Sequence, residues 1–212
     1  MIWSNVTVLT PGENFDLISL DNVKAFFNVT TTTDDERLQQ LITFNSLVIA
    51  DLCSRVFALE EVEETFGNAD WSTTPGTALN LDRWPVRELV SVTVGGSAVA
   101  AGDYTVERAT GILRYGPYPG GEVVVHYKAG YDLPMEAPPQ LSMACIEGIR
   151  GSFYYGSRDP MIQAITDNNS GSIRFFPPPG VGRGASGGGN VWRPLTPTAT
   201  ALIQPYQKRS MA

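Results

Sequence analysis

The sequence predicts an α+β fold: a small helical bundle of two long helices and short terminal helices, with an inserted antiparallel β-sheet and long flexible loops. Helical periodicity runs over residues 34–56 and again over 140–156. Between them, residues 58–131 hold short segments rich in β-branched and aromatic residues, separated by Gly, Pro and Asp. The 21 Gly and 15 Pro among 212 residues predict a large share of turn and loop.

The stretch 34–56 has the clearest helical pattern. At about 1.5 Å per residue it spans roughly 35 Å, and its apolar face needs a partner. Residues 140–156 are the natural partner, because their many small side chains permit close packing. Thr33 and Glu36 have the spacing of a capping box at the start. The apolar stripe comprises Leu38, Leu41, Ile42, Val48, Ile49, Leu52, Cys53 and Val56, opposite a polar face of Gln39, Gln40, Thr43, Ser46 and Ser54.

Asn45 is the one polar residue on that stripe. A buried amide needs hydrogen-bond partners. We therefore expect Asn45 either to be satisfied within the helical pair or to face a neighbouring subunit.

Shorter signals flank these elements. Ser19 is a suitable N-cap for a helix over 19–28, and Gly95-Gly96 indicates a hairpin. Residues 197–208 suggest a short helix with Ala201, Leu202, Ile203 and Tyr206 on its apolar side, bent or ended by Pro205. The chain then divides into an N-terminal arm (1–18), a helical core (19–157) with its β insertion (58–131), an extended Gly/Pro-rich loop (158–194) and a C-terminal helix or tail (195–212).

Charge is unevenly distributed. The net charge is −7, made up of −10 over residues 1–134 (8 basic, 18 acidic) and +3 over residues 135–212 (7 basic, 4 acidic). The acidic body argues against a grip on nucleic acid through phosphate neutralisation. The basic end favours an acidic protein surface.

Several classes of protein are disfavoured by composition. His126 is the only histidine, which excludes a Cys/His zinc site, and we expect no cofactor. Cys53 and Cys145 lie in apolar helical patterns, where buried free thiols are expected rather than a disulfide. No apolar stretch reaches the length of a membrane span, so we expect no membrane association. No signal peptide is visible, so we expect the protein to be made in a cytoplasm.

The sequence offers little for catalysis. Glu60, Glu61, Glu63 and Glu64 are interpreted as a solvated acidic strand face rather than as acid–base or metal groups. His126 lies in a strand without a nucleophile motif such as G-x-S-x-G. The glycine run at 180–189 lacks the spacing of a phosphate-binding loop. The protein is therefore predicted not to be an enzyme.

Aromatic residues in the loops suggest binding instead. Trp192 with Arg193 has the composition of an interface anchor, whereas Trp84 is expected in the core. A strand-like apolar segment inside the long loop is a second candidate contact, formed by Ile173, Arg174, Phe175 and Phe176.

The order of these segments resembles the head-tail connector (adaptor) proteins of tailed bacteriophages. The resemblance covers about 19–157 and 197–207 and excludes 1–18 and 158–192. The segments that carry it are Ser19-Leu20-Asp21-Asn22-Val23-Lys24-Ala25-Phe26, Asp34-Asp35-Glu36-Arg37-Leu38, Asp51-Leu52-Cys53-Ser54-Arg55-Val56-Phe57, Leu79-Asn80-Leu81, Trp84-Pro85-Val86, Val90-Ser91-Val92-Thr93-Val94-Gly95-Gly96, Gly111-Ile112-Leu113, Val123 to Tyr131, Leu133-Pro134 and Leu202-Ile203-Gln204-Pro205-Tyr206.

The resemblance implies a subunit of a ring, typically of twelve copies, below the portal of a DNA-filled capsid. The ring extends the DNA channel, lets DNA pass without specific binding, and docks the stopper or tail-completion protein. The location implied is the virion head–tail junction, and the host cytoplasm during assembly. The C-terminal segment, 195–212, is implied to reach the portal. The candidate portal or neighbour contacts are Trp192, Arg193, Leu202, Ile203, Tyr206, Lys208 and Arg209.

Two rival hypotheses stay open. The first is a β-rich ligand- or carbohydrate-binding module of a phage tail that uses Trp71, Trp84 and Tyr118. The second is a hydrolase that uses His126 with the glutamates. Under the connector hypothesis, residues 158–194 are expected to become ordered only in the ring, and removal of 195–212 is expected to abolish portal attachment while sparing the fold.

Overall fold

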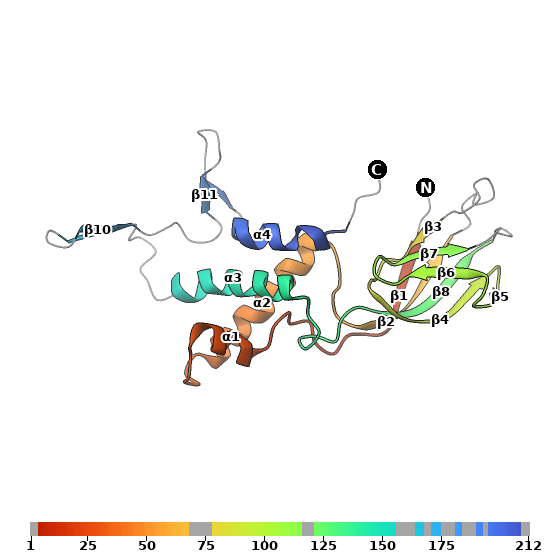
Figure 1. Cartoon of the computed structure of the whole chain (residues 1–212), viewed down its shortest axis with the longest axis horizontal. Helices are drawn as coiled ribbons and strands as arrows, with labels where there is room; N and C mark the ends of the chain where they lie inside the picture. Colours follow the sequence, from red (N-terminus) through yellow and green to blue (C-terminus); the bar gives the residue numbers. More distant parts are fainter. Residues whose placement is uncertain are drawn as a thin grey trace. The chain divides into compact units, whose positions relative to one another are not determined.

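The structure is a computed structural model, and it has the predicted α+β composition (Figure 1). It describes residues 4–67, 78–115, 121–155, 164–167, 171–174, 181–183, 190–192 and 195–208. The chain forms two compact units. We call them the β unit (Met1–Phe15 and Val56–Leu133) and the helical unit (Asp16–Arg55 and Pro134–Ala212).

The β unit contains two antiparallel sheets rather than the single inserted sheet that was predicted. The five-stranded sheet has the order β1-β2-β8-β4-β5, and the three-stranded sheet has the order β3-β7-β6. The strand bounds are β1 Ser4–Thr10, β2 Glu60–Phe66, β3 Ala78–Asn80, β4 Val86–Val94, β5 Ser97–Ala98, β6 Tyr104–Glu107, β7 Ile112–Tyr115 and β8 Val123–Ala129.

One hydrophobic core joins the two sheets. It takes Val62, Val92 and Val125 from the larger sheet and Leu79 and Leu113 from the smaller one. In β8 buried and half-buried residues alternate, as expected for a strand with one face on a core. The predicted hairpin is present: Gly95 and Gly96 both have positive φ, 55° and 81°, which a tight turn between strands requires.

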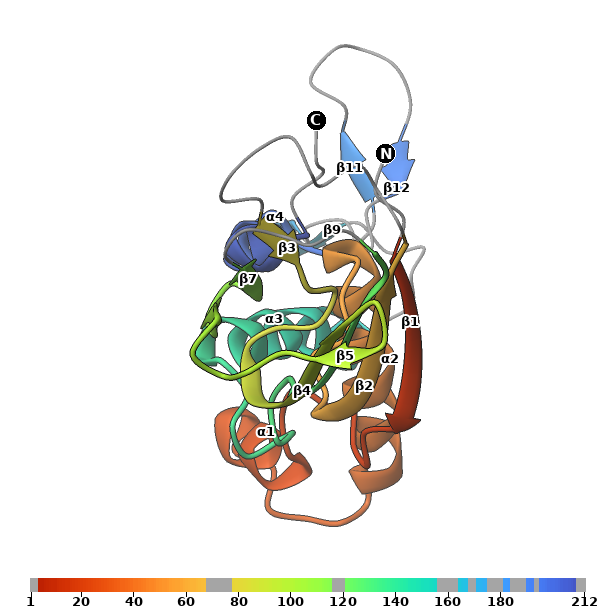
Figure 2. The same ribbon diagram turned by 90° about the vertical axis from the view of Figure 1, so that its right-hand side faces the viewer.

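Residues 4–10 are not a separate arm. They form β1, which pairs antiparallel with β2 in a register that sets Val6 opposite Glu64. β1 lies at one edge of the sheet, as Figure 2 shows. The short β-branched run Val6-Thr7-Val8-Leu9 was recognised as strand-like, but its pairing is with a strand more than 50 residues away and has no local signal.

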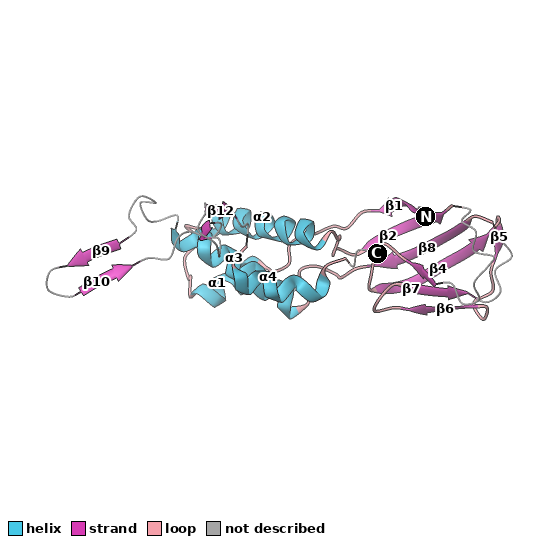
Figure 3. Cartoon of the chain, turned by 90° about the horizontal axis from the view of Figure 1, so that it is seen from above, coloured by secondary structure: helices cyan, strands magenta, loops and turns pink. Residues whose placement is uncertain are grey.

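Four α-helices lie in the described part of the helical unit (Figure 3). Their bounds are α1 Leu20–Phe27, α2 Asp35–Cys53, α3 Pro139–Tyr155 and α4 Pro197–Ile203. Ser19 caps α1 as predicted, since its side chain accepts a hydrogen bond from the Asn22 backbone N–H at 3.3 Å. The capping box predicted for α2 is wrong: α2 begins one residue later, after Asp34, and has no side-chain cap. Asp35 in its first turn instead binds the Lys24 ammonium at 2.6 Å.

α2 ends three residues before the predicted limit at Val56. Ser54 adopts the left-handed conformation, with φ 51°. Its N–H donates to Asp51 O, and the Arg55 N–H donates to Ala50 O, at 3.0 and 3.1 Å. This is the Schellman arrangement, which closes a helix by satisfying its last carbonyls.

The predicted pairing of the two long helices is present, and α2 packs against α3. Asn45 is satisfied within the pair: it is buried, and its side-chain amide donates to Leu41 O at 2.8 Å. Opposite it stands Gly148, where an added Cβ would overlap the Asn45 amide oxygen and lie 2.9 Å from its Cγ. α3 therefore approaches α2 closely because residue 148 has no side chain.

Ser46 was placed on the polar face of α2, but it is buried. Its hydroxyl accepts a hydrogen bond from the Leu17 backbone N–H at 2.9 Å and lies 3.7 Å from the Cys145 sulfur. The segment before α1 thus packs onto the pair, which the helical pattern alone does not reveal. Cys145 and Cys53 are both buried free thiols, as predicted.

α4 belongs to the core of the helical unit. Thr196 caps it, and a 3-10 turn over Gln204–Tyr206 that contains Pro205 follows it. Its buried residues are Ala199 and Ile203, and Leu195 just before it is buried too, whereas Ala201, predicted on the apolar side, is exposed. The chain after it is tied to the end of α2, since the Lys208 backbone N–H donates to Cys53 O at 2.9 Å. Removal of 195–212 would therefore strip apolar core residues, and it is not expected to spare the fold.

The long loop predicted at 158–194 contains two antiparallel strand pairs among its described residues. β9 (Ala164–Asp167) pairs with β10 (Gly171–Arg174), and β11 (Val181–Arg183) pairs with β12 (Asn190–Trp192). The other residues of 158–194 lie outside the described part of the chain, so the expectation about their order stays a prediction. No described helix is long and apolar enough to cross a membrane.

The contact at Gly148 gives a test of the helix pairing. Gly148→Ala is expected to destabilise the protein by about 1–3 kcal/mol, because the new methyl group must displace the Asn45 side chain in a packed core. Denaturant unfolding followed by circular dichroism measures the change. Gly102→Ala is the matched control, because an added Cβ there meets nothing within 4 Å. Equal effects of the two substitutions would contradict the close approach.

Candidate functional site

The candidate catalytic histidine forms a pair with one glutamate. His126 on β8 lies 2.8 Å from the Glu61 carboxylate on β2, through its Nε2 atom, and both side chains are half-buried. Ser91 on β4 stands opposite His126 in the strand register. Among the described residues, no hydroxyl forms a hydrogen bond with this imidazole, and no group of three or more His, Cys, Asp or Glu is placed to hold a metal ion.

Two of the four glutamates on β2 are buried, so the prediction of a solvated acidic face is wrong for them. Glu60 and Glu64 alternate with half-buried Glu61 and Glu63, and they point to the core side of the sheet. Strand alternation explains the result, because Glu60 and Glu64 lie on the same face of β2 as the core residues Val62 and Phe66. The sequence already showed that alternate residues of this strand share a face, but the four acids around Val62 suggested that both faces were polar.

Each buried carboxylate has partners inside the unit. Glu60 pairs with Arg83, whose Nε lies 3.0 Å from its carboxylate oxygen. The Oε2 atom of Glu64 accepts two hydrogen bonds, from the Tyr127 hydroxyl at 2.8 Å and from the Asp82 backbone N–H at 2.9 Å. Its other oxygen, Oε1, is buried without a hydrogen-bond partner. We call Glu60, Glu64, Asp82, Arg83 and Tyr127 the buried polar cluster.

The electrostatics of this cluster follow from burial. Burial raises the pKa of Glu64 above its ordinary value of 4.5, and the bonds from Asp82 and Tyr127 only partly oppose the rise. Burial also raises the pKa of the Tyr127 hydroxyl, and the neighbouring Glu64 charge adds to that rise. The charged form of Glu64 in this cluster therefore lowers the free energy of unfolding. The cluster also links the loop at 82–83 to strands β2 and β8.

The helical unit carries an exposed apolar strip on α2. Phe44 is 58% exposed and Leu47 is 51% exposed, and Leu52 continues the strip at 39%. Half-buried Leu41 and Val48 connect it to the inner face of the helix. We call these five residues the α2 outer strip. Leu41, Val48 and Leu52 were predicted on the partner-facing stripe, but they are half-buried or exposed. Phe44 and Leu47 were not predicted, although they are apolar residues among the polar ones of the other face.

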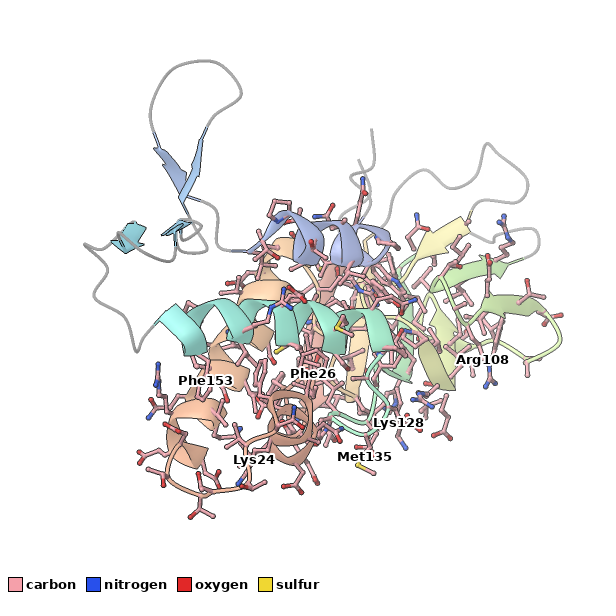
Figure 4. The ribbon with its side chains drawn as sticks, turned by 60° about the vertical axis from the view of Figure 1, so that its left-hand side comes forward. Lys24, Phe26, Arg108, Lys128, Met135 and Phe153 are labelled. Carbon is pink, nitrogen blue, oxygen red and sulfur yellow. The ribbon has the colours of Figure 1, made fainter. Side chains whose placement is uncertain are left out.

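An aromatic cluster stands at the α1 side of the same unit. The Phe27 and Phe153 rings stack with centroids 5.8 Å apart, and Phe26 meets Phe27 edge-on at 5.5 Å. The Arg37 guanidinium lies 5.2 Å from the Phe153 ring centroid, and its Nη2 donates to Phe153 O at 3.3 Å. Figure 4 labels Phe26 and Phe153. Phe26 is 44% exposed, so the cluster reaches the surface with the residue types that interfaces favour.

The C-terminal candidates divide into core and surface. Ile203 is completely buried and is therefore a core residue rather than a contact. Leu202 and Tyr206 are half-buried, and Lys208 is exposed. The Tyr206 hydroxyl donates to the Gln140 side chain at 2.8 Å, and Tyr206 O accepts a bond from Arg55. Arg209 lies outside the described residues.

The remaining candidates lie mostly outside the described part of the chain. Ile173 and Arg174 belong to β10 and Trp192 to β12, whereas Phe175, Phe176 and Arg193 lie outside the described residues. Trp71 and Tyr118 lie outside as well. Trp84 is half-buried rather than fully in the core.

The features gathered on the helical unit are exposed apolar and aromatic side chains with an arginine, which is the composition of a protein-binding surface. Such a surface is typical of proteins that contact neighbours. A family model for head completion proteins matches residues 16–164. The chain belongs to this head completion protein family, which agrees with the predicted head-tail connector.

Solved structures share the fold. One is the neck of an empty GTA particle computed with C6 symmetry, with a TM-score of 0.53 and 16% identity, covering 99% of this chain and 97% of the other. Another is a chain of the virion of a native gene transfer agent (GTA) particle, with a TM-score of 0.54 and 13% identity, covering 98% and 97%. A search of curated proteins finds no match.

The buried polar cluster predicts a pH-dependent stability. The raised pKa means that the folded chain binds the Glu64 proton more tightly than the unfolded chain does. The contribution of Glu64 to folding is therefore most favourable below about pH 4.5 and declines as the pH rises through the folded pKa. Glu64→Gln is expected to raise the free energy of unfolding at pH 7, with a gain that shrinks toward pH 4, as urea unfolding at both pH values would show.

Glu63→Gln is the matched control, because it removes the same charge from the half-buried side of β2. We expect a smaller effect at pH 7 there, because this side chain is only half-buried. Loss of stability at pH 7 in Glu64→Gln would contradict the account of Glu64.

Proposed function

We propose that this protein is a head-tail connector subunit that forms a ring under the portal, extends the DNA channel and docks the stopper or tail-completion protein. The observation that carries the proposal is the family match over 16–164, which includes all of α1, α2 and α3 and every strand from β2 to β8. It acts at the virion head–tail junction and is made in the host cytoplasm. The work is structural and needs no catalytic group.

A ring is supported by the neck structure computed with C6 symmetry, whose chain shares this fold. The resemblance of the sequence motifs to connectors implies twelve copies, and a ring of twelve copies is compatible with sixfold symmetry. Identical subunits close a ring by using two different surfaces on each copy. The α2 outer strip is apolar surface that such contacts would cover.

Passage of DNA without specific binding is supported by charge. The residues of the β unit, 1–15 and 56–133, include 12 acidic and 5 basic residues in the sequence. A surface of that sign does not neutralise phosphates, and it repels a duplex that must slide past.

Attachment to the portal is assigned to the end of the chain after α4. Lys208 is exposed there and Arg209 follows it, while Tyr206 and, within α4, Leu202 are half-buried beside them. Because α4 itself is built into the helical unit, point substitutions test this contact better than removal of 195–212 does.

The central expectation is a ring on the portal. The purified chain mixed with its portal is expected to give an added ring of density under the portal in negative-stain electron microscopy, with twelve copies per portal ring by native mass spectrometry. Density at a capsid face or a tail fibre, with none under the portal, would contradict the proposal. The glycan-binding rival predicts binding on a glycan array without any ring.

The charged end is expected to control attachment. The double substitution Lys208→Glu and Arg209→Glu should weaken binding to the portal at least about tenfold, because it reverses two charges at the contact. Surface-immobilised portal measures the affinity. Lys128→Glu, a charge reversal on β8 in the β unit, is the control and should leave the affinity within about twofold. Equal loss in both variants would indicate a general charge effect.

A further inference from the structure

β1 forms an edge of the five-stranded sheet, and β2 is its only neighbour among the described strands (Figure 2). Proteins usually protect such an edge by keeping it short or by placing charged residues on it. The other edges of the two sheets follow this rule, because β5 has two residues, β3 has three and β6 carries Glu107. β1 has seven residues, none of them charged, and its register with β2 is regular from Ser4 to Val8. Its outer edge is therefore open to another strand.

β1 is anchored on its own sheet. Gly12, just after the strand, packs so closely on Ala58 that an added Cβ would lie 2.6 Å from the Ala58 Cβ. The Thr10 hydroxyl donates to the Glu61 carboxylate on β2 at 3.4 Å. These contacts hold the strand in place, so its outer edge is a fixed template rather than a mobile arm.

A row of apolar residues crosses the sheet and ends uncovered on β1. Tyr127 on β8 lies opposite Val62 on β2, and Val62 lies opposite Val8 on β1. Tyr127 and Val62 are completely buried, whereas Val8 is 41% exposed, with no described strand beyond it. An apolar residue opposite Val8 on an added strand would continue the row and cover this side chain.

The β9–β10 pair has the matching need. It forms a sheet of two strands of four residues each, with no third strand among the described residues. A two-stranded sheet alone is only marginally stable in water. Ile165 lies opposite Ile173 in its register, so one face of the pair carries two apolar residues. The β11–β12 pair is less suited, because its strands have three residues and Gly182 occupies the middle of β11.

Charge selects β10 rather than β9 as the strand beside β1. Thr7 lies opposite Glu63 of β2, and Glu63 forms no ion pair within the described part of the chain. If β10 runs antiparallel to β1 with its isoleucine opposite Val8, Arg174 falls opposite Thr7. Two strand spacings, about 10 Å, then separate the backbones of Arg174 and Glu63, and the two long side chains together span that distance across Thr7. β9 ends in an acid, Asp167, instead.

We propose that β10 of one copy adds to the outer edge of β1 in the next copy, antiparallel, with Ile173 opposite Val8. This inference rests on the proposed ring and names one contact between its subunits. Backbone hydrogen bonds along the added strand supply affinity, and the side chains opposite Val8 and Thr7 fix the register. β1 belongs to the β unit and β10 to the helical unit, so each copy uses two different surfaces. Such a contact closes into a ring by rotation.

The test is disulfide formation in the assembled ring. Chains with Val8→Cys and chains with Ile173→Cys are mixed, assembled on the portal, oxidised mildly and run on a non-reducing denaturing gel. We expect a dimer from the mixture and none from either variant alone, because residues directly opposite on neighbouring strands have Cβ atoms about 5 Å apart. Burial raises the pKa of Cys53 to about 11 and that of Cys145 to about 12, so the native thiols stay protonated and unreactive.

Thr7→Cys mixed with Ile173→Cys is the matched control. Thr7 is also exposed, but it alternates to the other face of β1. We expect little dimer from this mixture, and a yield equal to that with Val8→Cys would refute the register.

Four further results would overturn the contact. A wild-type ring with no dimer from the Val8→Cys mixture places the contact elsewhere and leaves the ring proposal standing. A dimer from Val8→Cys alone indicates that β1 pairs with β1 of another copy. A double variant, Val8→Cys with Ile173→Cys, that crosslinks only within one chain indicates that β10 covers its own β1. A wild-type chain that forms no ring on the portal refutes the proposed function and this contact together.

Charge reversal with rescue gives an independent readout. Arg174→Glu in the Ile173→Cys chain should lower the dimer yield at least about fivefold, because it faces the acid Glu63. Glu63→Lys in the Val8→Cys chain should restore the yield to within about twofold of the original. Arg114→Glu, at an exposed arginine of β7, is the control and should leave the yield unchanged. Circular dichroism confirms that each variant folds. A yield that Arg174→Glu leaves unchanged, or that Glu63→Lys does not restore, refutes the proposed register.

Discussion

The close contact of α2 and α3 at Gly148 is the constraint on which the helical unit depends. With no side chain at 148, the Asn45 amide fits between the helices and still bonds to Leu41 O, so a polar residue is buried without an unpaired amide. This spacing brings Cys145 next to Ser46 and sets Phe153 under Arg37. It also fixes which face of α2 points outward. The outer strip is thus a consequence of how tightly the inner stripe packs.

The β unit is organised by a different interaction. Glu64 is buried and accepts bonds from Tyr127 and Asp82, while Arg83 next to it pairs with Glu60. A buried carboxylate disfavours folding unless it is paired, so these bonds matter more for defining the structure than for net stability. They connect the loop before β4 to β2 and β8. The cluster therefore fixes where the chain passes from the small sheet to the large one.

The sequence predicted the helices well, because their patterns are local. Ser19, the stripe of α2 and the hairpin at Gly95-Gly96 need only neighbours in the chain. The errors concern long-range pairing: β1 joins β2, Ser46 binds Leu17 N, and the long β region splits into two sheets. The burial of Glu60 and Glu64 was not predicted, because the acidic composition of β2 was given more weight than the alternation of its side chains between two faces. Phe44 and Leu47 were missed because a helix was expected to have one apolar face.

An exposed apolar strip favours association of free copies, and two features of the chain oppose it. The net charge of −7 separates them, since like charges repel at the distances over which approach begins. The α2 outer strip offers only a few apolar side chains, which is little area for a stable pair in solution. A portal that holds several copies side by side raises their effective concentration, and a weak lateral contact then suffices. The proposed ring is therefore expected to form on the portal as a template.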